Sequence, residues 1–315
     1  MGQHGTAASR PSSSANNVDD APIEQQQQQD ARVDNEELVA LPEEEGLLLL
    51  PVQLQRLHIY NLSELICLCS NSHDDNKEDG QIRQGGLREL PSCSSKLQVL
   101  CIGDVAGVTG TPICSLLCSS LTKLIFRGDQ YVKRFTEEQE TLLFVNSLEE
   151  IRFQYCKSLQ ALPARLLNLP NLKILCLYMC ERIQIRPEDH LPNSLQELCI
   201  HDCTEIRSLP DGLPGSLQKL SIRWRPRIQS LSGDLPSSLQ ELSIDNFPEI
   251  RSLPKDSLPS SLQKLEIRRC PAIWWLPKVD DLPSSMRELN VRNSENEELR
   301  TQRQKLKGII PIVHA

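Results

Sequence analysis

The chain has 315 residues, of which 24% are charged, and its net charge of -8 gives a pI near 5.4. This acidic balance argues against general nucleic-acid binding, which needs a basic surface. No apolar run approaches the length of about 18 residues that a membrane-spanning helix requires, so we expect no membrane span.

The N-terminal segment 1–45 is rich in Ser, Asn, Asp and Gln and contains five consecutive glutamines at Gln25–Gln29. Such a segment cannot bury enough apolar surface to offset the entropy lost on ordering, so its composition predicts disorder. It lacks the apolar core of a secretory signal, which predicts a cytoplasmic protein, or alternatively a nuclear one, with 12 reduced cysteines. Gly2 and Thr6 fit the myristoylation pattern M-G-x-x-x-[S/T], a short pattern that often matches by chance.

A phrase of the form L-x-x-L-x-I recurs through the rest of the chain. It begins, at intervals of 22 to 27 residues, at Leu97, Leu121, Leu148, Leu172, Leu195, Leu217, Leu239, Leu262 and Met286. An earlier copy begins at Leu54, and the polar segment after it, about 70–95, predicts a loop inserted into this repeat. A period near 22 residues is typical of a solenoid, in which each unit packs only on its neighbours. We assign 46–293 to this solenoid.

Each repeat predicts one short strand followed by an irregular return path. Leu242 and Ile244 alternate with Glu241, Ser243 and Asp245, so that the two aliphatic side chains point inward and the three polar ones outward. The phrase L/I-x-x-L-P then adds inward aliphatic residues, and a Pro/Ser loop prevents a continuous helix. We therefore expect a β-rich α/β repeat solenoid with a parallel concave sheet and a convex side of turns and short 3₁₀ pieces.

The C-terminal segment 294–315 departs from the repeat pattern. Ser294 and Glu297 have the spacing of a capping box, which predicts a polar helix to about Lys307 and a short strand after Gly308. We expect this segment to be a polar cap over the last repeat, as a solenoid requires.

Four repeats carry a cysteine at their ninth position: Cys156, Cys180, Cys203 and Cys270. Other residue types occupy that position elsewhere, which favours a ladder of buried small residues bonded to the strand-to-turn backbone. Because neighbouring strands lie about 4.8 Å apart, zinc or disulfide geometry stays an alternative. Cys114 and Cys118 are a single weak instance of the paired spacing that zinc prefers, so we predict no metal site.

Catalysis has little support in the sequence. None of the six histidines lies in a metalloprotease, triad or nucleophile-elbow pattern. The glycines of Gly103–Thr111 lack the Gly-Lys-Ser/Thr with which a Walker A loop holds phosphate, which favours a turn between two repeats. We therefore expect neither an enzyme nor a cofactor.

The outward face of the predicted sheet carries two kinds of side chain. Charges alternate between strands from Glu197 onward, and again at Arg223, Asp245 and Arg268, so cross-strand ion pairs account for them without a partner. Apolar and aromatic side chains gather upstream, although aromatic residues form only 4% of the chain. Tyr, Trp and Arg dominate the hot spots of protein interfaces. We therefore predict a protein-binding surface on the concave face, made of Tyr155, Ile174, Tyr178, Met179, His201, Trp224, Arg268 and Arg269.

A second exposed apolar patch is predicted on the outer side of the solenoid. Trp274 and Trp275 stand where other repeats carry polar pairs such as Arg207 and Ser208.

For the concave surface, contact with another part of the same chain or with an absent domain is the alternative to a partner protein.

The repeats resemble leucine-rich repeats over roughly Leu54–Val313. More narrowly, SLQELCIHDCTEIRSLP and SLQKLEIRRCPAIWWLP, with their Cys-x-x-I/L-x-x-L-P phrase, resemble the C-terminal repeats of plant intracellular immune receptors of the nucleotide-binding, leucine-rich-repeat class, particularly those of grasses. The resemblance implies a horseshoe-shaped domain that recognises pathogen effectors or modified host proteins and holds the nucleotide-binding domain inactive. The outward residues named above would then be the recognition surface.

The chain departs from that family because it carries neither a Walker A motif nor a nucleotide-binding or N-terminal signalling domain. Nucleotide binding is therefore not carried over. We predict a non-catalytic recognition module of plant defence, whose partner is a pathogen effector, a host protein or a receptor's nucleotide-binding domain. The alternatives are a general intracellular signalling scaffold and, more remotely, the repeat domain of bacterial effector ubiquitin ligases, whose units share L-P-x-x-L-P-x-S-L but are shorter and favour Asn over Cys.

Overall fold

The computed structural model of the chain describes the ranges 55–59, 96–108, 120–186, 188–224, 235–248, 258–273, 281–292 and 297–314, together with the single positions 228, 250, 253, 276 and 278. The segment 1–45 and the loop insertion predicted at about 70–95 lie outside these residues. No helix in the described ranges combines the length and the apolar character that crossing a membrane takes.

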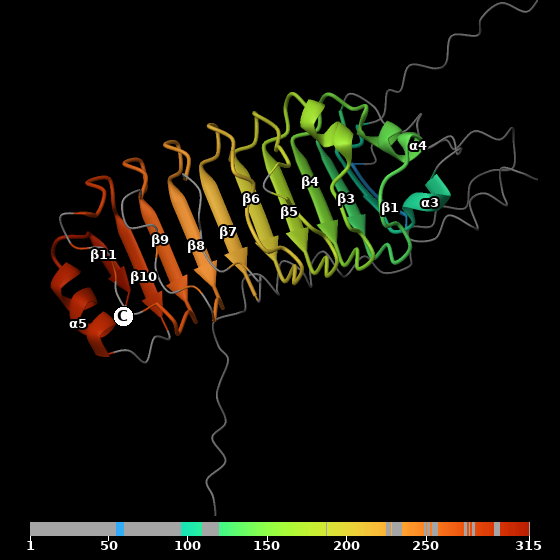
Figure 1. Ribbon diagram of the computed structural model, residues 1–315. Coiled ribbons are helices and arrows are strands. Elements are labelled where there is room, and N and C mark those ends of the chain that lie inside the picture. The colour runs from blue at the N-terminus through green and yellow to red at the C-terminus, as the bar shows by residue number, and fades with distance from the viewer. Residues whose placement is uncertain are drawn as a thin grey trace, which may run out of the picture. The chain divides into compact units, whose positions relative to one another are not determined.

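Within the described part of the chain, eleven parallel strands form one open sheet, in which spatial order follows chain order (Figure 1). The strands are β1 Arg56–Ile59, β2 Val99–Ile102, β3 Lys123–Arg127, β4 Glu150–Gln154, β5 Ile174–Tyr178, β6 Glu197–His201, β7 Lys219–Arg223, β8 Glu241–Asp245, β9 Lys264–Arg268, β10 Glu288–Arg292 and β11 Ile312–His314. Strands β1 to β10 all begin at the third residue of the predicted phrase. The β-rich leucine-rich-repeat solenoid is therefore confirmed.

The return paths contain short helical pieces rather than long helices. Those described are α3 Val105–Val108, α4 Glu137–Glu140, and the 3₁₀ turns η2 Thr141–Leu143 and η3 Ala164–Asn168. Proline stands at the start of the turn that closes several later repeats, where the backbone N–H of Leu239 donates to the Pro236 carbonyl at 2.9 Å. This is the Pro/Ser turn expected from the sequence, since proline supports a turn and cannot continue a helix.

The core is a single apolar column between the sheet and the return paths. Leu242 and Ile244 of β8 are fully buried, and the equivalent residues of the neighbouring strands join the same cluster. Beyond β10, the helix α5 Glu297–Leu306 lies beside the end of the sheet (Figure 1). Leu299 and Leu306 of α5 bury their side chains in that cluster, so the apolar end of the column is covered.

A serine joins most repeats to the one before. The serine that precedes the first leucine of the phrase donates its hydroxyl to the carbonyl of the first leucine in the preceding repeat, with Oγ···O distances of 2.6 to 2.9 Å. This serine ladder consists of Ser120, Ser147, Ser194, Ser216, Ser238, Ser261 and Ser285. The ladder satisfies a carbonyl in every repeat it reaches, which a buried polar group requires.

We expect Ser238→Ala to lower the free energy of unfolding by about 1–2 kcal/mol, because it leaves the partly buried Leu217 carbonyl without its donor. The measurement is urea unfolding followed by circular dichroism. Ser237→Ala is the matched control, since this neighbouring serine is exposed and its loss should shift the curve little. Equal shifts for the two variants would contradict a structural role for the ladder.

Candidate functional site

The outward side chains of the sheet form three rows across the strands, because each strand is in register with its neighbour. Each row is named by the position that its residues occupy in their strands, so the three are the first, the third and the fifth row. The first row is Lys123, Glu150, Ile174, Glu197, Lys219, Glu241, Lys264 and Glu288. The third row is Ile125, Arg152, Cys176, Cys199, Ser221, Ser243, Glu266 and Asn290. The fifth row is Arg127, Gln154, Tyr178, His201, Arg223, Asp245, Arg268 and Arg292.

The first row contains the cross-strand ion pairs expected from its alternating charges. They are Lys123–Glu150 at 3.4 Å, Lys219–Glu241 at 3.1 Å and Lys264–Glu288 at 3.1 Å, each measured from Nζ to a carboxylate oxygen. Solvent reaches these side chains, so each pair contributes at most about 1 kcal/mol. The charges of this row are largely satisfied within the sheet.

Aromatic rings line up across β4, β5 and β6. The ring centroids of Tyr155 and Tyr178 lie 5.3 Å apart in an edge-to-face arrangement, and those of Tyr178 and His201 lie 6.4 Å apart. His201 Nε2 lies 3.2 Å from the Ser221 hydroxyl of the next strand. We call Tyr155, Tyr178 and His201, with the half-buried Ile174 of the first row, the aromatic run.

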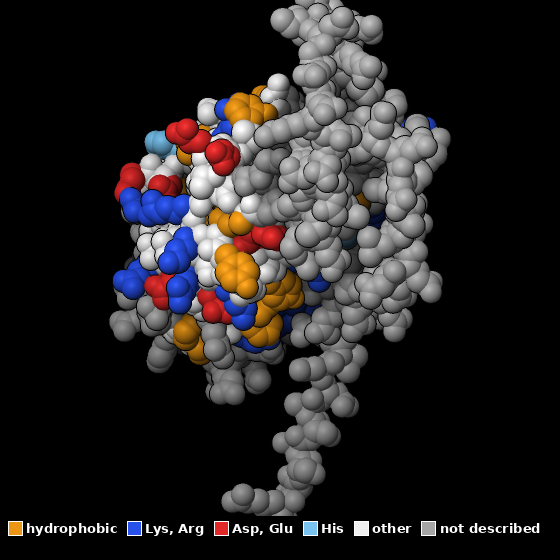
Figure 2. Space-filling model, turned by 90° about the vertical axis from the view of Figure 1, so that its right-hand side faces the viewer, with side chains coloured by type: hydrophobic (Ala, Val, Ile, Leu, Met, Phe, Trp, Pro, Cys, Tyr) orange, Lys and Arg blue, Asp and Glu red, His pale blue; other side chains and the backbone are white. Residues whose placement is uncertain are grey.

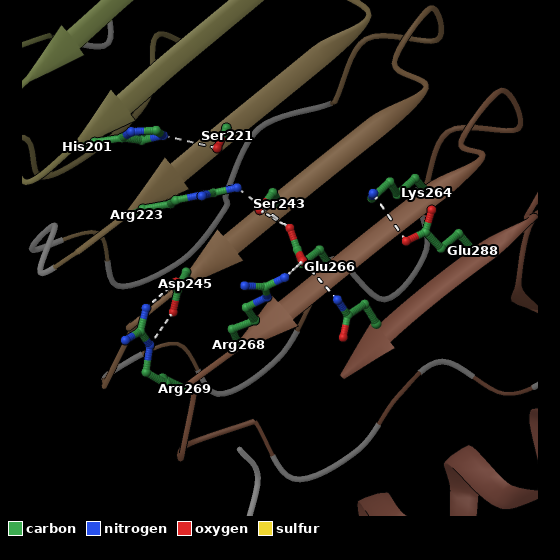
Figure 3. Close-up of polar contacts among 11 residues, drawn as sticks. His201, Ser221, Arg223, Ser243, Asp245, Lys264, Glu266, Arg268, Arg269 and Glu288 are labelled. Carbon is green, nitrogen blue, oxygen red and sulfur yellow. Dashed lines mark hydrogen bonds and ion pairs between the residues drawn. The ribbon is translucent and has the colours of Figure 1, made fainter. Parts of the chain in front are cut away.

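A buried carboxylate, Asp245 of β8, holds the side chain of Arg269 (Figure 3). Asp245 points to the outward side, as the alternation predicts, but it is only 3% exposed. Arg269 makes two hydrogen bonds to it, from Nε to Oδ1 at 2.8 Å and from Nη2 to Oδ2 at 2.5 Å. The same guanidinium lies 4.3 Å above the ring of Trp224, which is 39% exposed. A bidentate ion pair therefore fixes the arginine that supports an exposed tryptophan.

A second buried carboxylate lies in the third row. Glu266 is 6% exposed, its oxygens lie 2.6 Å from Arg268 Nη2 and 3.7 Å from Arg223 Nη2, and Ser243 and Asn290 donate to it at 2.9 Å. Burial opposes its ionisation, but the Ser243 hydrogen bond and the charges of Arg268 and Arg223 outweigh burial and hold the pKa of Glu266 below its usual range.

These contacts correct the pairing that the sequence predicts in the fifth row. Asp245 was expected to pair with Arg223 and Arg268 on the adjacent strands. The structure pairs it with Arg269, the residue after β9, while Arg223 and Arg268 turn to Glu266. The turn after β9 explains the difference, because it places the Arg269 guanidinium over Asp245. The other two arginines then interact with Glu266 of the third row.

The residue that follows each strand from β4 to β9 has a positive φ: Tyr155 57°, Met179 52°, Asp202 54°, Trp224 65°, Asn246 61° and Arg269 47°. We call these six residues the rim. Each rim residue donates its backbone N–H to the last carbonyl of the next strand, as Trp224 does to Asp245 at 2.9 Å. A left-handed conformation costs an ordinary residue roughly 1–2 kcal/mol, and glycine or asparagine adopts it more readily.

The bulky rim residues therefore carry a conformational cost that the fold alone does not demand. Gly128, at the equivalent position after β3, has a φ of 81° and shows that glycine serves there. Tyr155, Met179, Trp224 and Arg269 occupy the same position with large side chains. Strain of this kind is more often retained at functional sites than elsewhere.

The structure places all eight residues predicted for the concave face on these rows or on the rim. Trp224 is exposed and the other seven are half-buried. Trp274 and Trp275, the predicted second patch, lie outside the described residues. That any of these side chains contacts a partner stays a prediction.

The sequence did not predict three exposed apolar side chains of the return paths. Tyr131 is 82% exposed, Phe144 57% and Leu167 43%, and all three lie on return paths. The guanidinium of Arg165 lies 3.3 Å from the Phe144 ring centroid. Seen from the side of α3 and α4, apolar side chains form separate patches among mixed charges (Figure 2). The return paths lack the strict alternation of the strands, so periodicity gave no signal there.

The cysteines of the ninth position form the buried ladder expected of them. The Cys156 thiol donates to the Phe126 carbonyl at 3.4 Å, Cys180 to that of Phe153 at 3.5 Å, and Cys270 to that of Arg268 at 3.0 Å. Burial raises the pKa of the Cys270 thiol to about 11, so it is protonated at neutral pH. In the described ranges, no three His, Cys, Asp or Glu side chains are grouped to hold a metal ion.

A polar groove of about 510 Å³ lies on the return paths rather than on the sheet face. Its lining is Arg134, Gln160, Ala161, Arg182, Gln184, Arg186, Asp189 and Glu205. Asp189 accepts from the backbone N–H of Arg186 at 2.8 Å and Glu205 pairs with Arg207 at 3.7 Å, so both acids already have partners.

Comparison with protein families matches one model, the FNIP Repeat, to residues 229–270. This range contains strands β8 and β9. The match covers well under half of the chain and describes a pair of repeats rather than the whole. A search of curated proteins finds no match.

Several solved structures are similar to the chain. The leucine-rich repeat domain of the type III effector XopL is 22% identical over 64% of this chain and 70% of that domain, with a TM-score of 0.45. YopM from Yersinia enterocolitica is 24% identical over 65% of this chain and 39% of YopM, with a TM-score of 0.40. A leucine-rich repeat protein from Leptospira interrogans is 19% identical over 72% of this chain and 62% of that protein, with a TM-score of 0.36. Similarities this low carry no argument about a partner.

We expect His201 to make stability fall on mild acidification. Burial, and next the charge of Arg223, lowers the pKa of His201 from 6.5 to about 4. Between these values the unfolded chain binds more protons than the folded one, so the free energy of unfolding falls as the pH falls from 6.5 towards 4. After allowance for partial exposure, the loss is about 2 kcal/mol.

Urea unfolding across this pH window measures the effect. His201→Gln should flatten the pH dependence, whereas His190→Gln, at an exposed histidine, should leave it as in the unmodified chain. If the free energy of unfolding varies with pH in the same way in the unmodified chain and in His201→Gln, then His201 titrates alike in the folded and the unfolded state.

Proposed function

We propose that the chain is a non-catalytic protein-recognition module whose outward sheet face binds a partner protein. The observation that supports this most is the aromatic run, which lies on the same face as the ion pairs of the first row. Tyrosine and histidine rings offer large contact areas with few rotatable bonds, which suits them to protein interfaces.

The packing of the site favours recognition without rearrangement. Tyr178 contacts a ring on each side, and the Arg269 that supports Trp224 is itself held by Asp245. Side chains fixed before binding lose less entropy when the complex forms. The proposal therefore needs a stable sheet and no covalent step.

The finer proposal is a role in plant defence. The Cys-x-x-I/L-x-x-L-P phrase supports it, since the same phrase underlies the resemblance to plant intracellular receptors. On this proposal the chain works in the cytoplasm or nucleus, and its partner is a pathogen effector, a host protein or the nucleotide-binding domain of a receptor.

The second candidate function is a general signalling scaffold. The observation that favours it is a pair of exposed apolar side chains, Phe144 and Leu167, on the return paths away from the aromatic run. A scaffold needs separate surfaces for separate partners, and exposed apolar groups commonly mark such surfaces.

Site-specific photo-crosslinking in the cells that express the chain tests the proposal. A photoreactive phenylalanine in place of Tyr178 should yield a discrete protein adduct, because that position lies in the aromatic run. The same group in place of Tyr131, which is 82% exposed on a return path, is the matched control and should not yield that adduct. Adding Ile174→Glu should abolish the Tyr178 adduct. The same adduct from both positions, or none from Tyr178, would overturn the proposal.

The same experiment separates the two candidate functions. An adduct that forms only after pathogen challenge supports defence sensing and contradicts a constitutive scaffold. An adduct that forms in unchallenged cells, together with a second protein crosslinked from position 144, supports the scaffold.

A further inference from the structure

Positive charge gathers along one edge of the outward face, although the chain as a whole carries -8. The fifth row contains four arginines against the single Asp245: Arg127, Arg223, Arg268 and Arg292. The first row, on the other edge, contains three lysines against four glutamates. The two edges of one sheet therefore differ in charge, and three of the four arginines lie on β7 to β10.

The acids near these arginines are already engaged. Asp245 forms an ion pair with Arg269, and Glu266 forms ion pairs with Arg268 and Arg223 (Figure 3). Arg223 lies 3.7 Å from Glu266, which is longer than a hydrogen bond. The side chains of Arg223 and Arg268 keep 23% and 31% of their surface exposed. A partner can therefore reach both arginines, and Glu266 does not hold Arg223 by a hydrogen bond.

An exposed tryptophan borders these arginines. Trp224 follows Arg223 directly in the chain, keeps 39% of its surface exposed, and stacks against Arg269. Its place on the rim requires a positive φ of 65°, which favours glycine over an indole. An arginine beside a tryptophan that is rigidly held is the composition of an interface hot spot.

We infer that the β7–β9 end of the outward face binds an acidic segment of the partner protein. Carboxylates of that segment would accept from Arg223 and Arg268, while its apolar atoms pack on Trp224. The inference rests on the proposed function, since it names the chemistry of the partner bound by the same face. A nucleic acid fits less well, because its continuous phosphates would also approach Glu241 and Glu288 of the first row.

A fluorescein-labelled peptide of alternating Asp, Glu and Leu is the probe, and its anisotropy with the full chain is the readout. The acidic peptide should bind, and its affinity should fall with added salt because both binding groups are charged. The same peptide with Asn and Gln in place of the acids should bind at least about tenfold more weakly.

Two substitutions on one strand provide the matched comparison. Arg223→Gln removes a charge from the fifth row and should weaken binding by about tenfold. Lys219→Gln removes the same charge from the first row of β7 and should change the affinity by less than about twofold. Circular dichroism of both variants confirms the fold. Equal losses would overturn the inference, because they would show general charge attraction.

Trp224→Gly gives a second, independent readout. Binding should weaken by about tenfold, while the urea midpoint stays the same or rises because glycine accepts the positive φ. Full-strength binding by this variant would remove the tryptophan from the site. A single-stranded oligothymidylate that binds more tightly than the peptide, and that loses affinity in Arg223→Gln, would replace the acidic segment with nucleic acid.

The outcome is distinct from a failure of the proposed function. If the Tyr178 crosslink captures its partner and the acidic peptide does not bind, the face recognises protein and the inferred chemistry is wrong. If the Tyr178 crosslink fails as well, the face itself is not the binding surface.

Discussion

Each repeat completes the hydrogen bonds of the repeat before it, and the rest of the structure depends on this sideways bonding. Strand amides, the serine ladder and the rim N–H groups all reach across to a neighbour. The apolar column is shared in the same way, because Leu242 and Ile244 pack among their equivalents in adjacent strands. A unit on its own would leave both flanks unsatisfied, so stability is a property of the stack.

That constraint explains how much of the fold could be predicted. Strand starts and the inward leucines follow from a period of two within each phrase, which is local information. The serine ladder could not be predicted, because a serine such as Ser238, two residues after a proline, is equally typical of a turn, and its acceptor lies a whole repeat away. The Asp245–Arg269 ion pair could not be predicted from the sequence for a related reason. Alternation gives the side of the sheet on which a residue lies, but a turn with positive φ decides where a long arginine reaches.

The outward face is less constrained than the core, and its features differ along the array. The aromatic run occupies β4 to β6, and the arginines with Trp224 occupy β7 to β9. Both regions consist of side chains that the sequence singles out. Only the structure shows that His201 of β6 hydrogen-bonds to Ser221 of β7 and so connects the two regions. The cost of the bulky rim residues is tolerated because every rim amide is bonded to the next strand, which holds the strained turns in place.

The uniform register of the strands bears on how such an array can change its length. A shift of one residue would turn inward leucines outward, whereas gain or loss of a complete repeat keeps every row aligned. Unequal recombination between the repeats of β6 to β9 would deliver complete repeats, each with its own serine donor, proline turn and rim residue. The outward side chains of such a copy would acquire new neighbours in the rows. Duplication of a whole repeat can thus create new combinations of outward side chains while the buried contacts of each repeat stay the same.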